Sequence, residues 1–207
     1  MNKMFDQYRT DFFNKLNFDF EKGRKILDIG CGDGKDAEVF IKKFKLVTYG
    51  VDVYTNPEIT NVKGLKFIED KNGVLKLPFK DNTFDYVYMH DVLHHVDEKN
   101  QSYEMHLLGL KEAKRVVKPG GSVIVVEGNR FNPLFYPHMV LMLGHQHFTQ
   151  KYFKKIIRGV FDDVEFKFFE CHFYPEKLLP IFYLYERFME TFSPEALLAY
   201  NVAVARK

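Results

Sequence analysis

The sequence has 207 residues, with 30 basic and 28 acidic side chains and a formal net charge of +2. This length fits a single domain, because single hydrophobic cores stop growing only near ~250–300 residues. Hydrophobic residues make up 46% and charged residues 28%, values close to the globular average that exclude a wholly disordered chain. The nearly balanced charge gives no strong attraction to nucleic acid, so we expect no nucleic-acid partner.

The first residues and the apolar runs predict neither secretion nor membrane insertion. The N-terminus is charged and aromatic and has no apolar segment before a small-residue cleavage site. No run reaches the ~18–20 uncharged apolar residues that a membrane helix needs. Two cysteines, Cys31 and Cys171, cannot form a disulfide framework or a four-cysteine zinc site. We therefore expect a cytoplasmic protein.

Helical and strand-like patterns alternate along the first part of the chain. Apolar positions at helical spacing predict helices over residues 3–16, 36–44 and 101–117. Apolar runs predict strands over residues 24–29, 46–53, 65–68, 83–89 and 122–127. Pro119-Gly120-Gly121 is expected to end the helix before the last of these strands. Strands that alternate with helices indicate an α/β fold with a doubly wound, mostly parallel sheet.

The pattern changes after residue 130, where aromatic side chains become dense. Thr149 is placed to cap a helix, and residues 163–169 alternate like a strand. A further helix over residues 178–189 and a last strand over residues 200–205 complete the chain. With no repeat or linker, we predict one domain over residues 1–207. Its core spans 24–128, and residues 3–16 and 130–198 form cap elements that select the substrate.

A glycine-rich loop, Asp28-Ile29-Gly30-Cys31-Gly32-Asp33-Gly34, joins the first strand of this core to a helix. Glycines permit positive φ and let the backbone approach a ligand closely. The loop opens onto a helix N-terminus, which attracts anionic or electron-rich groups. Asp52 ends the next strand about 20 residues later, where a carboxylate can accept both hydroxyls of a ribose. The pattern predicts a ligand that contains adenosine.

Two residues of this loop region bear on which adenosine ligand binds. The dinucleotide fingerprint requires a third small residue, and Lys35 stands at that position. Asp28 at the start of the loop would repel a pyrophosphate but attract an amine. A nicotinamide-dependent oxidoreductase is therefore the alternative rather than the main prediction.

Four segments resemble, in the correct order, the motifs of the class I S-adenosylmethionine-dependent methyltransferases. They are ILDIGCGDG, VDV around Asp52, LPFKDNTFDYVYMHDVLHHV and LKEAKRVVKPGGSVIVVE. The resemblance covers roughly residues 24–128 and implies a seven-stranded, Rossmann-like sheet with S-adenosyl-L-methionine as cofactor. It implies that the amino-acid end of the cofactor contacts the loop residues Asp28, Gly30, Cys31, Gly32, Asp33 and Gly34.

The resemblance also assigns residues outside the glycine loop. It implies that Asp52, with Val53 beside it, binds the ribose and that Asp70 meets the adenine amine. It places His90 along the methionine moiety. Tyr8 on the N-terminal helix could close over the same end of the cofactor, although core packing of that helix face explains it equally well.

Methyl transfer is an in-line displacement at a sulfonium, which alignment in a dry site can accelerate. A general base helps only where the acceptor must lose a proton. His95 or His90 is the predicted base, and Glu127, at the carboxyl edge of the sheet, is a predicted substrate contact or else a solvated strand end. His90-x3-His94, with Asp91, has the spacing of a metal site on a helix. The resemblance nevertheless favours a site without metal.

The aromatic region after residue 130 bears on the acceptor. His145 and His147 form either a loop near the acceptor or a surface loop. The region itself is either a helical cap or an apolar pocket for a small or lipid-like acceptor, with a surface that touches a membrane. We therefore predict methylation of a small-molecule or lipid-like acceptor, with oxygen as the favoured atom. A non-catalytic scaffold or regulatory subunit that binds the cofactor is a further alternative, and the oligomeric state is not predicted.

Overall fold

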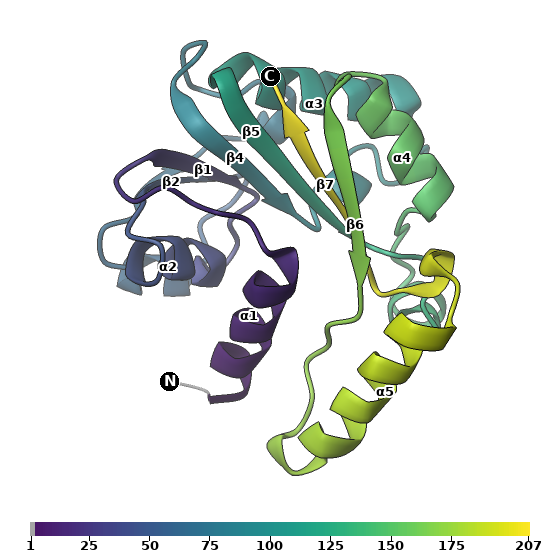
Figure 1. Cartoon of the computed structure of the whole chain (residues 1–207). Helices are drawn as coiled ribbons and strands as arrows, with labels where there is room; N and C mark the ends of the chain where they lie inside the picture. The colour runs from purple at the N-terminus through teal and green to yellow at the C-terminus, as the bar shows by residue number, and fades with distance from the viewer. Residues whose placement is uncertain (1–2) are drawn as a thin grey trace.

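The computed structural model describes residues 3–207, and within them a seven-stranded sheet lies between helices (Figure 1). The strands are β1 (Lys25–Ile29), β2 (Val47–Asp52), β3 (Lys66–Glu69), β4 (Phe84–His90), β5 (Val117–Gly128), β6 (Val164–Phe169) and β7 (Tyr200–Arg206). Their spatial order is β3-β2-β1-β4-β5-β7-β6. Only β7 runs antiparallel to its neighbours. The predicted doubly wound, mostly parallel sheet is confirmed, and its strand order reverses between β1 and β4.

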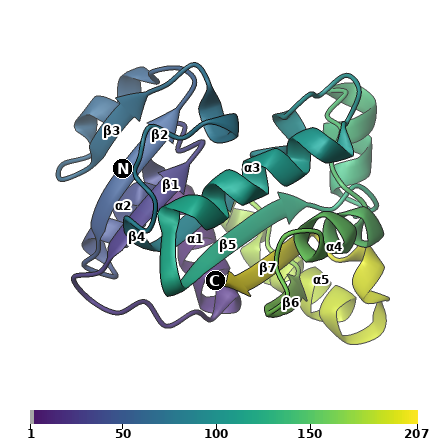
Figure 2. The ribbon, with the colours of Figure 1, turned by 90° about the horizontal axis from the view of Figure 1, so that it is seen from above.

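Helices cover both faces of the sheet. They are α1 (Lys3–Leu16), α2 (Lys35–Lys42), α3 (Tyr103–Val116), α4 (Gln150–Arg158) and α5 (Leu179–Phe192). Apolar residues of α3 and α4 pack on one face, and those of α1 and α2 pack on the other. Figure 2 shows α3 lying along β5 on its side of the sheet. In Figure 1, α5 extends beyond the end of β6.

The central strands are apolar almost without interruption because both of their faces are buried. Along β1, Leu27 and Ile29 pack toward α3 and α4, whereas Ile26 packs toward α1 and α2. Phe12 of α1 and Phe40 of α2 are fully buried on this second face. At the carboxyl ends of β2 and β4 the last residues are polar, Asp52 and His90.

The structure differs from the sequence prediction at two places. β5 begins at Val117 instead of Ser122, because its register with β4 shifts and residues 118–121 bulge out of the sheet. Gly120, with φ of 76°, lies in this bulge, which takes the place of the predicted turn. A wide helical turn over Tyr136–Met142 was not predicted, since it carries no amphipathic stripe.

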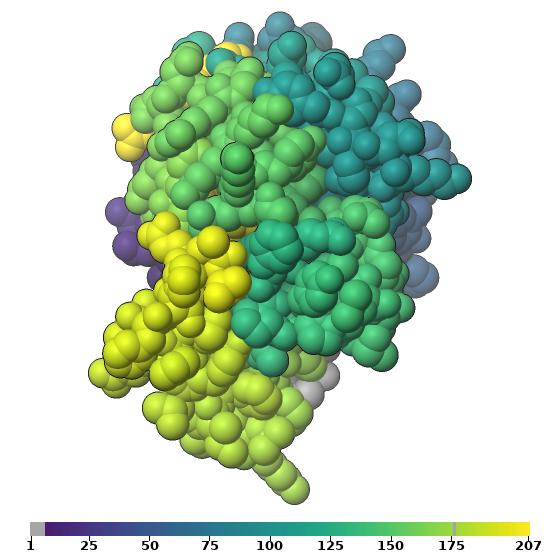
Figure 3. All heavy atoms as spheres, turned by 90° about the vertical axis from the view of Figure 1, so that its right-hand side faces the viewer, coloured from purple at the N-terminus to yellow at the C-terminus, as the bar shows by residue number. Residues whose placement is uncertain are grey.

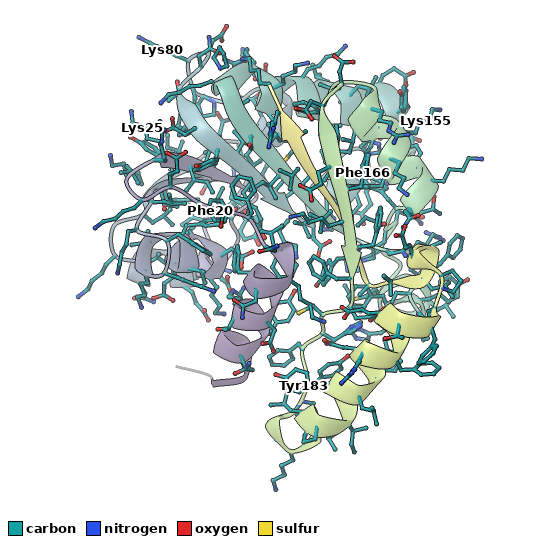
Figure 4. The ribbon with its side chains drawn as sticks, viewed as in Figure 1. Phe20, Lys25, Lys80, Lys155, Phe166 and Tyr183 are labelled. Carbon is teal, nitrogen blue, oxygen red and sulfur yellow. The ribbon has the colours of Figure 1, made fainter. Side chains whose placement is uncertain are left out.

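A partly buried polar network ties α1 to the C-terminal region. Lys15 Nζ lies 2.8 Å from Glu186 Oε2, and Glu170 Oε1 accepts a hydrogen bond of 2.8 Å from Asn132 Nδ2. On α5, Tyr183 is on the side that faces α1 (Figure 4), and its hydroxyl donates to Asp11 Oδ2 at 2.7 Å. These contacts hold α5 beside the N-terminal helix.

No helix within residues 3–207 is both long enough and apolar enough to span a bilayer.

Candidate active site

A polar crevice lies where β1, β2 and β4 end, at the point where the strand order reverses. This is the edge at which open α/β sheets bind ligands. The crevice comprises a smaller cavity of about 260 Å³ and a larger one of about 640 Å³. Gly30, Gly32 and Asp91 line both cavities, so the two are neighbouring compartments of one site.

The backbone of the glycine loop forms the wall between the compartments. Gly30 has a φ of 67°, and a Cβ added to it would lie 2.5 Å from Cγ2 of Val92. Gly34, with a φ of 78°, precedes the first residue of α2 and lines neither cavity. Larger residues at these two positions would strain the backbone and crowd the loop. Cys31 lines the smaller cavity, and burial raises the pKa of its thiol.

The smaller cavity contains a carboxylate without a hydrogen-bond partner. Asp28 Oδ2 is buried and has no partner among the described residues. Burial, together with the negative charges of Asp36 and Asp52, raises the pKa of Asp28 well above its usual value. Asp33 also lines this cavity. A ligand ammonium would satisfy Asp28 and relieve this excess of negative charge, so the cavity fits an amino-acid group.

His90 and Tyr8 form a fixed wall of the smaller cavity. His90 Nδ1 lies 2.9 Å from Asp36 Oδ2, and Arg9 Nε lies 2.9 Å from Asp36 Oδ1. Burial opposes a charge on His90, but Asp36 outweighs it and raises the pKa of the imidazole. The His90 ring stacks on Phe12 with centroids 4.8 Å apart. The hydroxyls of Tyr8 and Tyr200 are 2.6 Å apart.

Asp52 stands at the end of β2, in the larger cavity. Its Oδ2 accepts a hydrogen bond of 2.8 Å from Gly32 N, and its Oδ1 accepts one of 2.7 Å from Val53 N. Val53 and Tyr54 line the same cavity. A longer bond of 3.4 Å from Tyr54 N also reaches Oδ1, so the backbone donors orient the carboxylate and Oδ2 keeps a lone pair for a further donor. This geometry fits a pair of sugar hydroxyls.

Asp70 does not line either cavity. Its Oδ1 accepts hydrogen bonds of 2.8 Å from both the backbone and the side-chain amide of Asn72. The larger cavity is lined instead by the segment 71–75 and by Asp97. The adenine contact of Asp70 therefore stays a prediction.

On the other side of Asp91 lies a buried pair, Glu127 and His94. Glu127 Oε1 accepts hydrogen bonds from Val92 N (3.1 Å) and Leu93 N (2.7 Å), and its Oε2 lies 2.7 Å from His94 Nδ1. Burial opposes a charge on His94, but Glu127 outweighs it and raises the pKa of His94 to about 9. The predicted solvated strand end is wrong, because Glu127 is fully buried.

His95 follows this pair and has a different environment. Its side chain is 49% exposed and lines the larger cavity. Burial and the positive charge of His94 lower its pKa, which keeps the imidazole neutral near pH 7. Its Nδ1 lies 3.7 Å from Glu98 Oε2, so of the two histidines predicted as a base His95 is the one at the open side of the crevice with the weaker carboxylate contact.

The sequence predicts for His147 either a surface loop or a loop near the acceptor, and the structure rules out the surface position because it buries the side chain. It is 4% exposed and lies against His94, with ring centroids 4.4 Å apart. A Cβ added to Gly128 would lie 2.9 Å from His147 Nδ1, so this glycine makes room for the ring. The only signal in the sequence was the spacing of His145 and His147 just before a helix cap.

Comparisons with known proteins agree with this geometry. Residues 27–125 match the family model described as a methyltransferase domain. The chain is 30% identical, over 63% of its length, to a demethylmenaquinone methyltransferase of Geobacillus sp. (strain WCH70), and 29% identical, over 75%, to that of Anoxybacillus flavithermus (strain DSM 21510 / WK1). The matched parts make up only 57% and 65% of those two relatives.

The fold has a close match among solved structures. A SAM-dependent methyltransferase from Archaeoglobus fulgidus superposes with a TM-score of 0.68 at 18% sequence identity, covering 100% of this chain and 95% of that one. The matched family model begins within β1 and ends within β5, so it includes the glycine loop and the ends of β2 and β4 at the crevice. Residues 27–125 are therefore similar to a methyltransferase domain, and the chain has the fold of the solved methyltransferase.

Proposed function

We propose that this chain transfers the methyl group of S-adenosyl-L-methionine to a small-molecule or lipid-like acceptor. The observation that carries the proposal is the crevice with a carboxylate in each compartment, Asp28 in one and Asp52 in the other. A ligand with an ammonium group at one end and a sugar in the middle matches these two carboxylates. The bacterial relatives, which are named for demethylmenaquinone, support a small-molecule acceptor.

The residues of the crevice divide the binding of the cofactor between them. Asp28 pairs with the ammonium group, and the wall of His90 and Tyr8 encloses the amino-acid end. Asp52 accepts the ribose hydroxyls from a position that Gly32 N and Val53 N fix. Preorganised acceptors of this kind cost little reorganisation when the ligand binds.

Bound S-adenosylmethionine supplies a methyl group on a positively charged sulfur; the acceptor bonds to that carbon as the carbon–sulfur bond breaks. An acceptor hydroxyl must also lose a proton, and His95 is the proposed base because its neutral ring lines the larger cavity. Glu127 acts as a positioning residue, since it holds the backbone at Val92 and Leu93 beside Gly30. His90 is less suited to this role because its Nδ1 is engaged by Asp36.

An exposed apolar surface beside the C-terminal region supports a lipid-like acceptor. Figure 3 shows residues 131–146 and the segment around α5 next to each other on one face. The most exposed apolar side chains there are Leu141, Met142, Ile181, Leu184, Phe188 and Phe192. Exposed patches of this kind mark contacts with apolar partners. The proposal therefore includes peripheral contact with a membrane that holds the acceptor.

The test uses the full chain and cofactor labelled in its methyl group. We expect calorimetry to detect binding of the cofactor and label to enter a lipid fraction or small molecules of an aqueous extract. Label that enters only protein or nucleic acid would discard the acceptor class. Binding without turnover in any fraction would favour a non-catalytic scaffold, and an absorbance change of added nicotinamide cofactor would favour an oxidoreductase.

A further inference from the structure

Four side chains from three separate segments meet beside the crevice. Asp91 and His94 follow β4, Glu127 lies near the end of β5, and His147 precedes α4. Each offers one ligand atom, and these atoms all lie within 4.8 Å of one another. His94, Glu127 and His147 are at most 4% exposed, so the group forms a buried cluster rather than a surface charge patch.

His147 gives an independent sign that this cluster lacks a partner. Both of its ring nitrogens are buried, and neither has a hydrogen-bond partner among the described residues. A neutral imidazole has one donor and one acceptor, and leaving both unsatisfied in the interior is costly. The ring is nevertheless held in place beside His94 and under Gly128. A ligand that binds an imidazole nitrogen would satisfy the His147 ring.

The chemistry of the four groups points to a cation. Two imidazoles with two carboxylates are a common ligand set for zinc and related divalent transition metals. The backbone supports such an arrangement, because Gly128 N donates to Asp91 Oδ1 (2.8 Å) and so orients the carboxylate. The Asp91 side chain is 35% exposed and lines both cavities, which provides a route for an ion.

We propose that Asp91, His94, Glu127 and His147 form a binding site for one divalent transition-metal cation. The set differs from the metal spacing visible in the sequence, since His90 is held by Asp36 on the opposite side of Asp91. It also departs from the expectation of a metal-free site that the family resemblance favoured. Binding of the ion displaces the proton shared by His94 and Glu127, which is released to solvent, and gives His147 a partner.

The test measures metal binding by the full chain in the absence of cofactor, so its failure is distinct from failure of methyl transfer. Chelator-stripped protein is titrated with Zn²⁺ by calorimetry and with Co²⁺ by visible absorption. We expect one equivalent to bind and the melting temperature to rise with Zn²⁺. His147→Gln and Asp91→Asn are expected to weaken binding at least tenfold. Asparagine tolerates the positive φ of 54° at position 91, so this second variant preserves the backbone.

His138→Gln is the matched control, because His138 is an exposed histidine on the neighbouring wide turn. It should bind Zn²⁺ as the unmodified chain does. A second group, His94, His95 and His145, also has ligand atoms within 4.8 Å of one another. The proposal is overturned if no stoichiometric metal binds, or if His95→Gln abolishes binding while His147→Gln leaves it unchanged.

Discussion

Two histidine–carboxylate pairs flank Asp91, and their surroundings differ. His90 and Asp36 belong to a closed network, in which Asp36 also contacts Arg9 and the His90 ring stacks on an aromatic ring. His94 and Glu127 lie deeper, and their neighbour His147 has no hydrogen-bond partner among the described residues. The first pair is part of the cavity wall in the proposed cofactor site. The second borders the side on which an acceptor would enter.

The difference separates a preformed half of the site from an adaptable one. On the cofactor side, the backbone donors of Gly32 and Val53 orient Asp52 before any ligand binds. On the other side, the buried imidazole of His147 has no hydrogen-bond partner among the described residues. The nearby surface exposes apolar side chains of α5. A rigid half suits a constant cofactor, whereas the other half can be varied to suit the acceptor.

We expect the largest loss of stability when the deeper pair, His94 and Glu127, is broken. Glu127→Ala leaves His94 and the backbone N–H groups of Val92 and Leu93 buried without their acceptor. We expect a loss of about 3–5 kcal/mol in the free energy of unfolding, measured with urea in the presence of a chelator. Asp36→Ala removes the partner of a less buried pair and should cost only about 1–3 kcal/mol. A larger loss for Asp36→Ala would reverse the comparison.

The next effect tests the cofactor half directly. Asp52→Ala removes a buried carboxylate that a ribose would bind, so calorimetry should show cofactor affinity reduced well over tenfold, or about 1.5–3 kcal/mol. Asp70→Ala is the comparison variant, because Asp70 lines neither cavity. An unchanged affinity is expected for it. A tenfold loss in Asp70→Ala would restore the adenine contact that the sequence predicted, and unchanged affinity in Asp52→Ala would remove the ribose role.

The cofactor half is also the part that sequence reasoning described best. Glycines at fixed positions, a carboxylate at the end of β2 and alternating elements are local signals, and the structure brings Gly30, Gly32 and Asp52 to one crevice. Which residues of the loop after β3 line the cavity was harder to predict from the sequence. Its residues 71–75 line the cavity in place of Asp70, because the length of a loop decides where its side chains lie.

The acceptor half depends on contacts between distant segments, which a sequence does not display. Glu127 looked like a strand end at the surface, yet its partners come from the loop after β4. His147 lies 53 positions from His94 in the chain, and only the folding of α4 onto the sheet brings the two rings together. Local sequence patterns therefore predict least well which polar residues are buried by distant parts of the chain.

Asp28→Asn should change stability and cofactor binding in opposite directions. Burial raises the pKa of Asp28, so between its usual value and the raised one the folded chain holds a proton that the unfolded chain has lost. Stability therefore falls as pH rises through this window. Asparagine removes the cost of burying a charged carboxylate. We therefore expect the variant without ligand to melt at a higher temperature than the unmodified chain, most clearly at pH values above this range. The pH dependence in that range should become shallower.

Cofactor affinity provides the second readout for Asp28→Asn. The amide cannot pair with an ammonium as a carboxylate does, so binding should weaken at least tenfold at pH 7 to 8 while the free protein gains stability. A variant that loses both stability and affinity would mean that Asp28 is a structural group rather than a binding one. Glu38→Gln on the outer part of α2 is a control for the change in net charge.

The smallest effect concerns the start of α4, beside the loop that holds His147. Thr149 accepts a hydrogen bond from Tyr152 N (3.2 Å), and Thr149→Ala should lower the free energy of unfolding by about 1 kcal/mol. Thr191→Ala, at an exposed site of α5, should change it by less than about 0.5 kcal/mol. Because the cap borders only the acceptor half, Thr149→Ala should weaken Zn²⁺ binding and leave cofactor affinity unchanged. Equal losses of both would show that the two halves of the site are mechanically coupled, which the separate networks around Asp36 and Glu127 argue against.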